Sequence, residues 1–189
     1  MSPFEYVSVL TSIVVGLAIA LLLQGVANLV QHPGRVKIYW IHLVWVAFMF
    51  FQAIFFWWWE FALESLDQWT LQVYMFVLFY AFIIFLLCAL LFPQDLEGYS
   101  GYEDYFMSRK GWFLGLMATY FLIDFWDTWL KGADYFASLG PEYVISTSLM
   151  IVGCLVGTRT SNRGYHAALA LLVLTYQLTS AFRNYDTLG

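Results

Sequence analysis

Two aspartates interrupt an otherwise apolar segment between Gly111 and Leu130 that is long enough to span a membrane. Asp124 and Asp127 are about one helical turn apart, so both project from one face of a helix. An ionised carboxylate inside a bilayer costs free energy unless it faces protein, water or a positive charge. These carboxylates are therefore the first candidates for function, as a site for a proton or a small cation.

A structural explanation competes for one of the two aspartates. Asp127 precedes Lys131 by four residues, the favoured order for an acid and base pair on a helix, so this pair can simply anchor the helix end. At a rise of about 1.5 Å per residue, Asp124 lies roughly 10 Å inside Lys131. Asp124 has no comparable local partner and is the stronger functional candidate.

The apolar run 38–63 supplies a second set of polar side chains. Helical spacing places six residues within one narrow arc: His42, Trp45, Met49, Gln52, Phe56 and Glu60. Glu60 is expected at a depth similar to that of Asp124, and two carboxylates meeting across helices hold a proton or cation between them. The alternative is that Gln52 and Glu60 make ordinary interhelical hydrogen bonds. Arg183 is a candidate counter-charge to Glu60 or Asp124, or it extends into the lipid headgroups.

The histidines and cysteines suggest a different chemistry. His32, His42 and His166 are expected at the cytoplasmic side, and paired imidazoles from facing helices hold haem in four-helix cytochromes. No Cys/His or carboxylate spacing completes a metal site, so we expect interfacial hydrogen bonding and no metal or cofactor. Cys88 and Cys154 lie in apolar runs without CxxC spacing and are expected to serve as packing residues.

The composition places these residues in a membrane. The chain is 62% apolar and 11% charged, against roughly 25% charged in soluble domains. It predicts an all-α, polytopic helical bundle in one domain of residues 1–189. Six transmembrane helices are expected, at about 3–31, 38–63, 69–92, 111–130, 142–158 and 164–183, with Ser2 as the first N-cap. The net charge of −5 and the scattered basic residues indicate no nucleic-acid partner.

Basic residues in the short loops predict the orientation, because they resist translocation. Six lie in the first, third and fifth loops: Arg35, Lys37, Arg109, Lys110, Arg159 and Arg163. Lys131 and Arg183 lie on the other side, so both termini are expected outside. The third loop, 93–110, is expected to carry a short amphipathic helix with Tyr99, Tyr102 and Phe106 on one face, which lies at the interface or docks a protein partner.

Small residues recur at the spacing of close helix contacts. Ser8, Ser12, Gly16 and Ala20 repeat every four residues, and Gly153 and Gly157 form a GxxxG motif. These stripes indicate contacts within the chain or between subunits. Because six short spans leave little room to enclose a solute, we expect a homo-oligomer.

The opening PFEYVSVLTSIVVGLAIALLLQGVANLVQ, followed by YWIHLVW and FFWWWEF, resembles a group of bacterial inner-membrane proteins. The resemblance extends over the first third of the chain. It implies a multi-pass protein of the bacterial cytoplasmic membrane with six or so helices, and it carries no activity, cofactor or site residue.

Common catalytic signatures are absent from the sequence. There is no Walker loop, GxSxG with a partner histidine, HExxH, GxGxxG or DxD-like pair on a cytoplasmic loop, so we expect no enzyme activity. The leading interpretation is conduction or sensing of a proton or small cation through Asp124, Asp127 and Glu60, with Gln52 and His42 extending the path inward. The alternatives are a non-transporting accessory or scaffold subunit and a haem or pigment binder.

Overall fold

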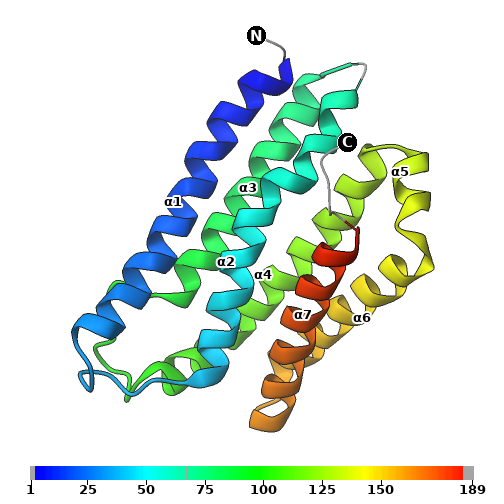
Figure 1. Ribbon diagram of the computed structural model, residues 1–189. Helices are drawn as coiled ribbons and strands as arrows, with labels where there is room; N and C mark the ends of the chain where they lie inside the picture. The colour runs from blue at the N-terminus through cyan, green and yellow to red at the C-terminus, as the bar shows by residue number, and fades with distance from the viewer. Residues whose placement is uncertain (1–2, 67, 185–189) are drawn as a thin grey trace.

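The computed structural model describes residues 3–66 and 68–184, and these contain helices and loops without a strand (Figure 1). The elements are α1 Pro3–Gln31, α2 Trp40–Glu60, the 3-10 helix η1 Phe61–Ser65, α3 Leu71–Leu91, α4 Tyr102–Leu130, α5 Ala133–Ser138, α6 Gly140–Arg159 and α7 Arg163–Asn184. Ser2, the expected N-cap of the first helix, lies outside the described residues. The all-α prediction is confirmed. The short helix α5 was not predicted.

Six long helices run back and forth between two ends of the molecule (Figure 1). We call the end that holds η1 and α5 the α5 end, and the opposite end, with loops 32–39, 92–101 and 160–162, the loop end. α1 packs on α3, and α4 packs on α3 and α6. α2 contacts α1, α3, α4 and α7, and α7 also contacts α6. α2, α4, α6 and α7 thus surround a common interior.

Within the described residues, five helices are long and apolar enough to cross a membrane: Phe4–Gln31, Trp40–Glu64, Leu71–Leu91, Gly140–Arg159 and Arg163–Arg183. Their outward faces carry large apolar side chains such as Leu17, Phe79 and Leu172, as expected for a lipid-facing surface. The chain therefore has the architecture of a multi-pass membrane protein. α4 has 29 residues, but it is not among these five.

The segment expected as a cytoplasmic loop, 93–110, is partly helical, and part of its helical portion is buried. α4 begins at Tyr102, so the expected interfacial helix is instead the first part of α4. Tyr102 and Phe106 are buried, and the Tyr102 ring stacks on His42 with ring centroids 4.6 Å apart. Tyr99 remains in the loop, where its hydroxyl accepts a hydrogen bond from Arg109 Nε at 3.0 Å. Packing against α2, rather than lipid, covers this aromatic face.

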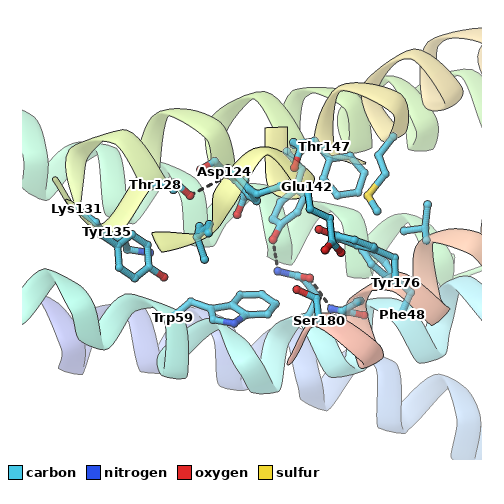
Figure 2. Close-up of a pocket in the computed structure, with 18 residues that line it drawn as sticks. Phe48, Trp59, Asp124, Thr128, Lys131, Tyr135, Glu142, Thr147, Tyr176 and Ser180 are labelled. Atoms are coloured by element: carbon cyan, nitrogen blue, oxygen red, sulfur yellow. Dashed lines mark hydrogen bonds between the residues drawn. The ribbon is translucent and has the colours of Figure 1, made fainter. Parts of the chain in front are cut away.

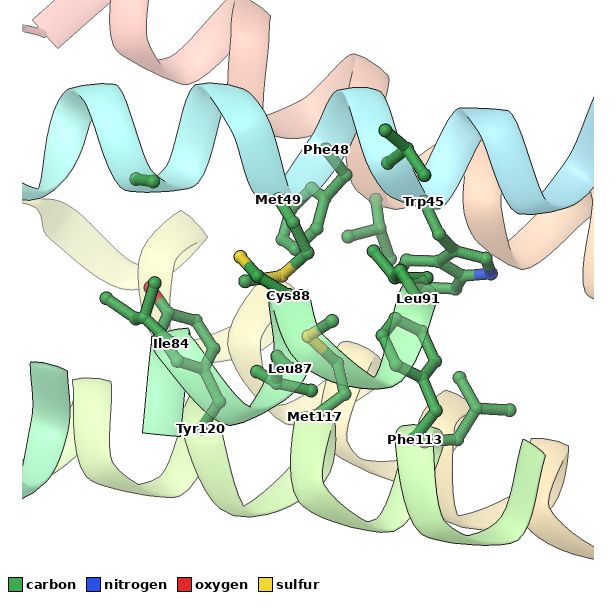
Figure 3. Packing of buried hydrophobic residues seen from close by; sticks show 14 of the residues in the cluster. Trp45, Phe48, Met49, Ile84, Leu87, Cys88, Leu91, Phe113, Met117 and Tyr120 are labelled. Atoms are coloured by element: carbon green, nitrogen blue, oxygen red, sulfur yellow. The ribbon is translucent and has the colours of Figure 1, made fainter. Parts of the chain in front are cut away.

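A dense apolar core fills the bundle between α2, α3 and α4 (Figure 3). Trp45 and Met49 from α2 meet Leu87 of α3 and Met117 of α4, and all four side chains are fully buried. Cys88 lies in this core and Cys154 is also buried, both as free thiols. The core separates the polar groups of the loop end from those of the α5 end.

The GxxxG motif of α6 lies at helix contacts within the chain. A Cβ atom on Gly157 would lie 2.7 Å from Leu114 Cδ1 of α4, and one on Gly153 would lie 2.9 Å from Leu169 Cδ1 of α7. The Tyr165 hydroxyl also donates to the Gly153 carbonyl at 2.7 Å. These glycines let α6 approach both neighbours closely.

The small residues of α1 are arranged differently. Ser12, Gly16 and Ala20 are exposed or half-buried, Ser8 is half-buried, and a Cβ on Gly16 would meet nothing within 4 Å. The inward face of α1 instead carries larger side chains and Gly25, so contact between subunits through the small-residue stripe stays a prediction.

Candidate cation site

Three charged side chains join the ends of α2 and α4. Lys131, directly after α4, donates from Nζ to Glu60 Oε1 at 3.0 Å and also forms a hydrogen bond with Asp127. Each of the three side chains is only 2% exposed. The pair that the four-residue spacing predicted is present, and Glu60 joins it from α2. Glu60 Oε2 and Asp127 Oδ1 are buried without a hydrogen-bond partner in the described part of the chain.

Asp124 is held separately, by two tyrosines. The Tyr80 hydroxyl of α3 donates to Asp124 Oδ1 at 3.0 Å, and the Tyr143 hydroxyl of α6 donates to Oδ2 at 2.8 Å. Thr128 is 2.8 Å from the Tyr143 hydroxyl and supports it. Among residues 3–66 and 68–184, no basic side chain forms an ion pair with Asp124. The expected meeting of Glu60 with Asp124 does not occur, because Lys131 holds Glu60 beside Asp127.

A chain of hydrogen bonds leads from α7 through α2 to Asp124. Gln177 Nε2 donates to Gln52 Oε1 at 2.5 Å, and Gln52 Nε2 donates to the Tyr120 hydroxyl. The hydroxyls of Tyr120 and Tyr80 lie 3.1 Å apart. Gln52 therefore takes part in the hydrogen-bond network around Asp124. The same bonds join α2 to α4 and α7, which is the alternative role that the sequence suggested for Gln52.

Gln52, Tyr120 and Gln177 border a cavity of about 130 Å³ between α2, α4, α6 and α7 at the α5 end. Its polar lining includes Gln52, Asp124, Lys131, Glu142, Tyr143 and Gln177. Trp59, Tyr135 and Tyr176 surround the same space as Asp124 (Figure 2). Glu60 and Asp127 do not line the cavity; they reach it through Lys131.

Arg183 has a partner other than the two that were considered. Its guanidinium donates to the Glu142 carboxylate at 2.5 and 3.3 Å, joining α7 to α6 at the rim of the cavity. Both side chains are more than half exposed. Arg183 is thus a counter-charge to Glu142. It does not pair with Glu60 or Asp124, which have the partners described above.

His42 lies away from the cavity. Its Nε2 is 2.7 Å from the Leu91 carbonyl, and its ring packs between Phe92 and Tyr102. Trp45 and Met49, both fully buried, separate it from Gln52 along α2. The expected inward extension of the polar path from Gln52 to His42 is therefore interrupted by apolar side chains.

The other histidines also make local contacts. His166 Nε2 is 3.0 Å from the Thr160 carbonyl, and its ring meets the edge of Phe106. His32 is exposed in the first loop. In the described residues, no group of three or more His, Cys, Asp or Glu side chains is arranged to hold a metal ion.

Sequence reasoning missed several members of the site. Tyr80 lies in a mainly apolar run, Gln177 lies among other polar residues of α7, and Tyr143 lies near the start of α6. A buried polar residue in a membrane helix is a functional signal, and this signal was available for Gln177. Tyr80 and Tyr143 could not be assigned to Asp124 without the helix arrangement.

No protein-family profile, curated protein or solved structure matches this chain. Glu60 and Asp127 share the single ammonium group of Lys131, and Glu142 is neutralised by Arg183. Asp124 has no ion-pair partner among the described residues and is bonded to two tyrosine hydroxyls. If all three carboxylates are ionised, two negative charges remain without a positive partner in the described residues. Such a site attracts protons and cations.

Proposed function

We propose that this protein binds and senses a proton or small cation in the cavity at its α5 end. The observation that carries the proposal is the charge imbalance between three carboxylates and one lysine. Uncompensated charges of one sign are costly within a membrane protein, and an added proton or cation removes that cost. Asp124 is the carboxylate of the three that borders the cavity, so it is the proposed point of contact.

Sensing is favoured over conduction by what lies beyond the cavity. Phe48 lines the cavity, and behind it the buried side chains of Trp45, Met49 and Met117 fill the bundle toward the loop end. An ion that moves through this layer would lose its polar ligands. The arrangement supports a site that fills and empties from one side.

The proposal includes α4 as a sixth membrane span, in a bacterial inner membrane. Packing against α3 and α6 supports this position for α4, because both neighbours are apolar enough to span. The loop end carries most of the basic residues, including Arg163, which pairs with Glu103 at 2.5 Å. The positive-inside rule then puts the loop end in the cytoplasm and the cavity toward the outside.

A second candidate is a non-transporting accessory subunit that works in a larger membrane complex. The observation that favours it is the use of Lys131 to join α2 to α4, which is a bracing role for two of the acids. Purification from native membranes distinguishes the two: a stoichiometric complex favours the accessory subunit.

The test of the leading proposal is ligand-dependent stability of the purified full-length protein in detergent. The melting temperature of the wild type is expected to shift with pH or with cation concentration at constant ionic strength. Asp124→Asn keeps an acceptor for Tyr80 and removes the charge, so its shift is expected to be lost. Glu97→Gln, in an exposed loop at the opposite end, is the control and is expected to respond like the wild type.

Two outcomes would change the proposal. If Asp124→Asn responds to pH and cations like the wild type, the cavity is not the binding site. If proteoliposomes pass protons or cations faster than empty vesicles and Asp124→Asn abolishes this flux, conduction replaces sensing.

A further inference from the structure

The hydrogen-bonded chain that ends at Asp124 has a defined polarity. A phenol hydroxyl carries one proton, and the Tyr80 proton is used to donate to Asp124 at 3.0 Å. When Asp124 is ionised and accepts the Tyr80 proton, the Tyr120 hydroxyl supplies the proton of the bond between the two hydroxyls, which lie 3.1 Å apart. Because Gln52 donates to Tyr120 and Gln177 donates to Gln52, every donor in the chain is directed toward the carboxylate.

The first acceptor of this chain is unfilled. Gln177 lines the cavity, is 6% exposed, and its Oε1 is buried without a hydrogen-bond partner in the described structure. A buried carbonyl oxygen without a donor is unfavourable, so the position calls for a group that donates. A ligand with an N–H group in the cavity would complete the chain at Gln177 and place positive charge in the space that Asp124 borders.

The cavity wall suits an organic cation. Its aromatic members include Trp59, Tyr135 and Tyr176, and aromatic faces attract ammonium groups through their negative π surface. One wall residue already shows this contact, because Lys131 Nζ lies 5.8 Å from the centroid of the Tyr135 ring. The volume of about 130 Å³ is close to that of an apolar cavity of about 150 Å³ that admits benzene, so a ligand of up to roughly six heavy atoms fits.

We propose, building on the cation site proposed above, that the bound cation is a small organic ammonium ion with at least one N–H group. Its N–H donates to Gln177 Oε1, its charge is balanced by Asp124, and its carbon atoms contact the aromatic wall. A metal ion is less suited to this site, since the described residues offer no cluster of three or more acidic, histidine or cysteine ligands.

The experiment is calorimetric titration of the full-length protein in detergent, at fixed pH and ionic strength. Ethylammonium, which has N–H groups, is expected to bind saturably and more tightly than sodium or potassium. Tetramethylammonium, which has none, is expected to bind through the aromatic wall and Asp124 alone. Gln177→Met is expected to weaken ethylammonium about tenfold and to leave tetramethylammonium unchanged.

Two further variants separate binding from folding. Gln177→Glu keeps an acceptor oxygen and is expected to retain ethylammonium binding. Thr179→Val, on an exposed part of the same helix, is the control and is expected to behave like the wild type. If Gln177→Met does not fold, the test is whether the wild type and Gln177→Glu bind ethylammonium more tightly than sodium or potassium.

Each contrary result has a distinct meaning. Sodium or potassium binding at least as tightly as ethylammonium, or a response to pH alone, would overturn the ammonium proposal and leave the cation site standing. Equal weakening of ethylammonium and tetramethylammonium by Gln177→Met would remove the proposed N–H contact. No response to any cation or to pH would overturn both proposals.

Discussion

At the residue scale, the acids of the site divide into two kinds. Asp127 and Glu60 are both bonded to Lys131, whose ammonium group compensates part of their charge. Asp124 is bonded to tyrosine hydroxyls, which stabilise a carboxylate without neutralising it. The first kind joins helices, whereas the second is available to a ligand from the cavity.

Removal of Lys131 is expected to be strongly destabilising. Lys131→Met leaves Glu60 and Asp127 buried without a cation, and loss of one partner from a buried ion pair typically costs about 3–5 kcal/mol. Unfolding in detergent, followed by circular dichroism, measures the change. Adding Glu60→Gln and Asp127→Asn to Lys131→Met is expected to recover much of the loss.

Arg183→Met is the matched control for Lys131→Met. It breaks the ion pair with Glu142, which is exposed to solvent, so a much smaller change in stability is expected. Equal effects of Lys131→Met and Arg183→Met would contradict the distinction between a buried bracing group and a surface pair.

Sequence could reveal only the local part of this site. The bond between Asp127 and Lys131 follows from a spacing of four residues on one helix. Burial of the face of α2 that carries Gln52 and Glu60 follows from helical periodicity. The partners of Asp124 come from α3 and α6, more than ten residues away along the chain, and no local pattern relates them.

At the element scale, side-chain size decides which helix faces meet. Gly25 of α1 lies so close to the Phe92 ring that a Cβ atom added to this glycine would overlap the ring atoms. Gly16, on the same helix, faces open space. The four-residue stripe of small residues in α1 resembles a packing motif, yet the inward face is set by bulkier side chains such as Val15 and Leu22. Spacing alone could not distinguish these two faces.

Gly25→Ala and Gly16→Ala form a matched pair of α1 variants. Gly25→Ala is expected to lower the free energy of unfolding by about 1–3 kcal/mol, because the new methyl group overlaps a packed ring. Gly16→Ala is expected to be neutral or slightly stabilising, since alanine favours helices. Thermal unfolding of both variants in detergent measures this, and a larger loss for Gly16→Ala would contradict the assigned faces. A changed oligomeric state in Gly16→Ala would instead support contact between subunits.

At the scale of the whole molecule, the two ends differ in chemistry. The α5 end contains the cavity and its acids, while the loop end carries most of the basic residues. Apolar composition was sufficient to predict a helical membrane bundle. It was not sufficient to predict that four helices of one chain line a cavity, because that depends on which of them become neighbours. The homo-oligomer expected from the sequence stays a prediction.

Orientation can be tested with single cysteines at the two ends. Asp134→Cys in α5 is expected to react with a membrane-impermeant thiol reagent in intact cells, whereas Arg35→Cys is expected to react only after permeabilisation. Both positions are exposed, and the native Cys88 and Cys154 are buried, so the background is low. Labelling of Arg35→Cys in intact cells would contradict the proposed topology.

The most direct test of the central claim is chemical modification of Asp124 itself. An apolar carbodiimide forms a stable adduct with protonated carboxyl groups inside membrane proteins, and mass spectrometry of the segment 111–130 locates it. An adduct is expected at Asp124, with a yield that falls as cation concentration rises, and little adduct is expected at Asp127, which is buried beside Lys131. An Asp124 yield unaffected by any cation, or equal modification of Asp124 and Asp127, would contradict a cation site at Asp124.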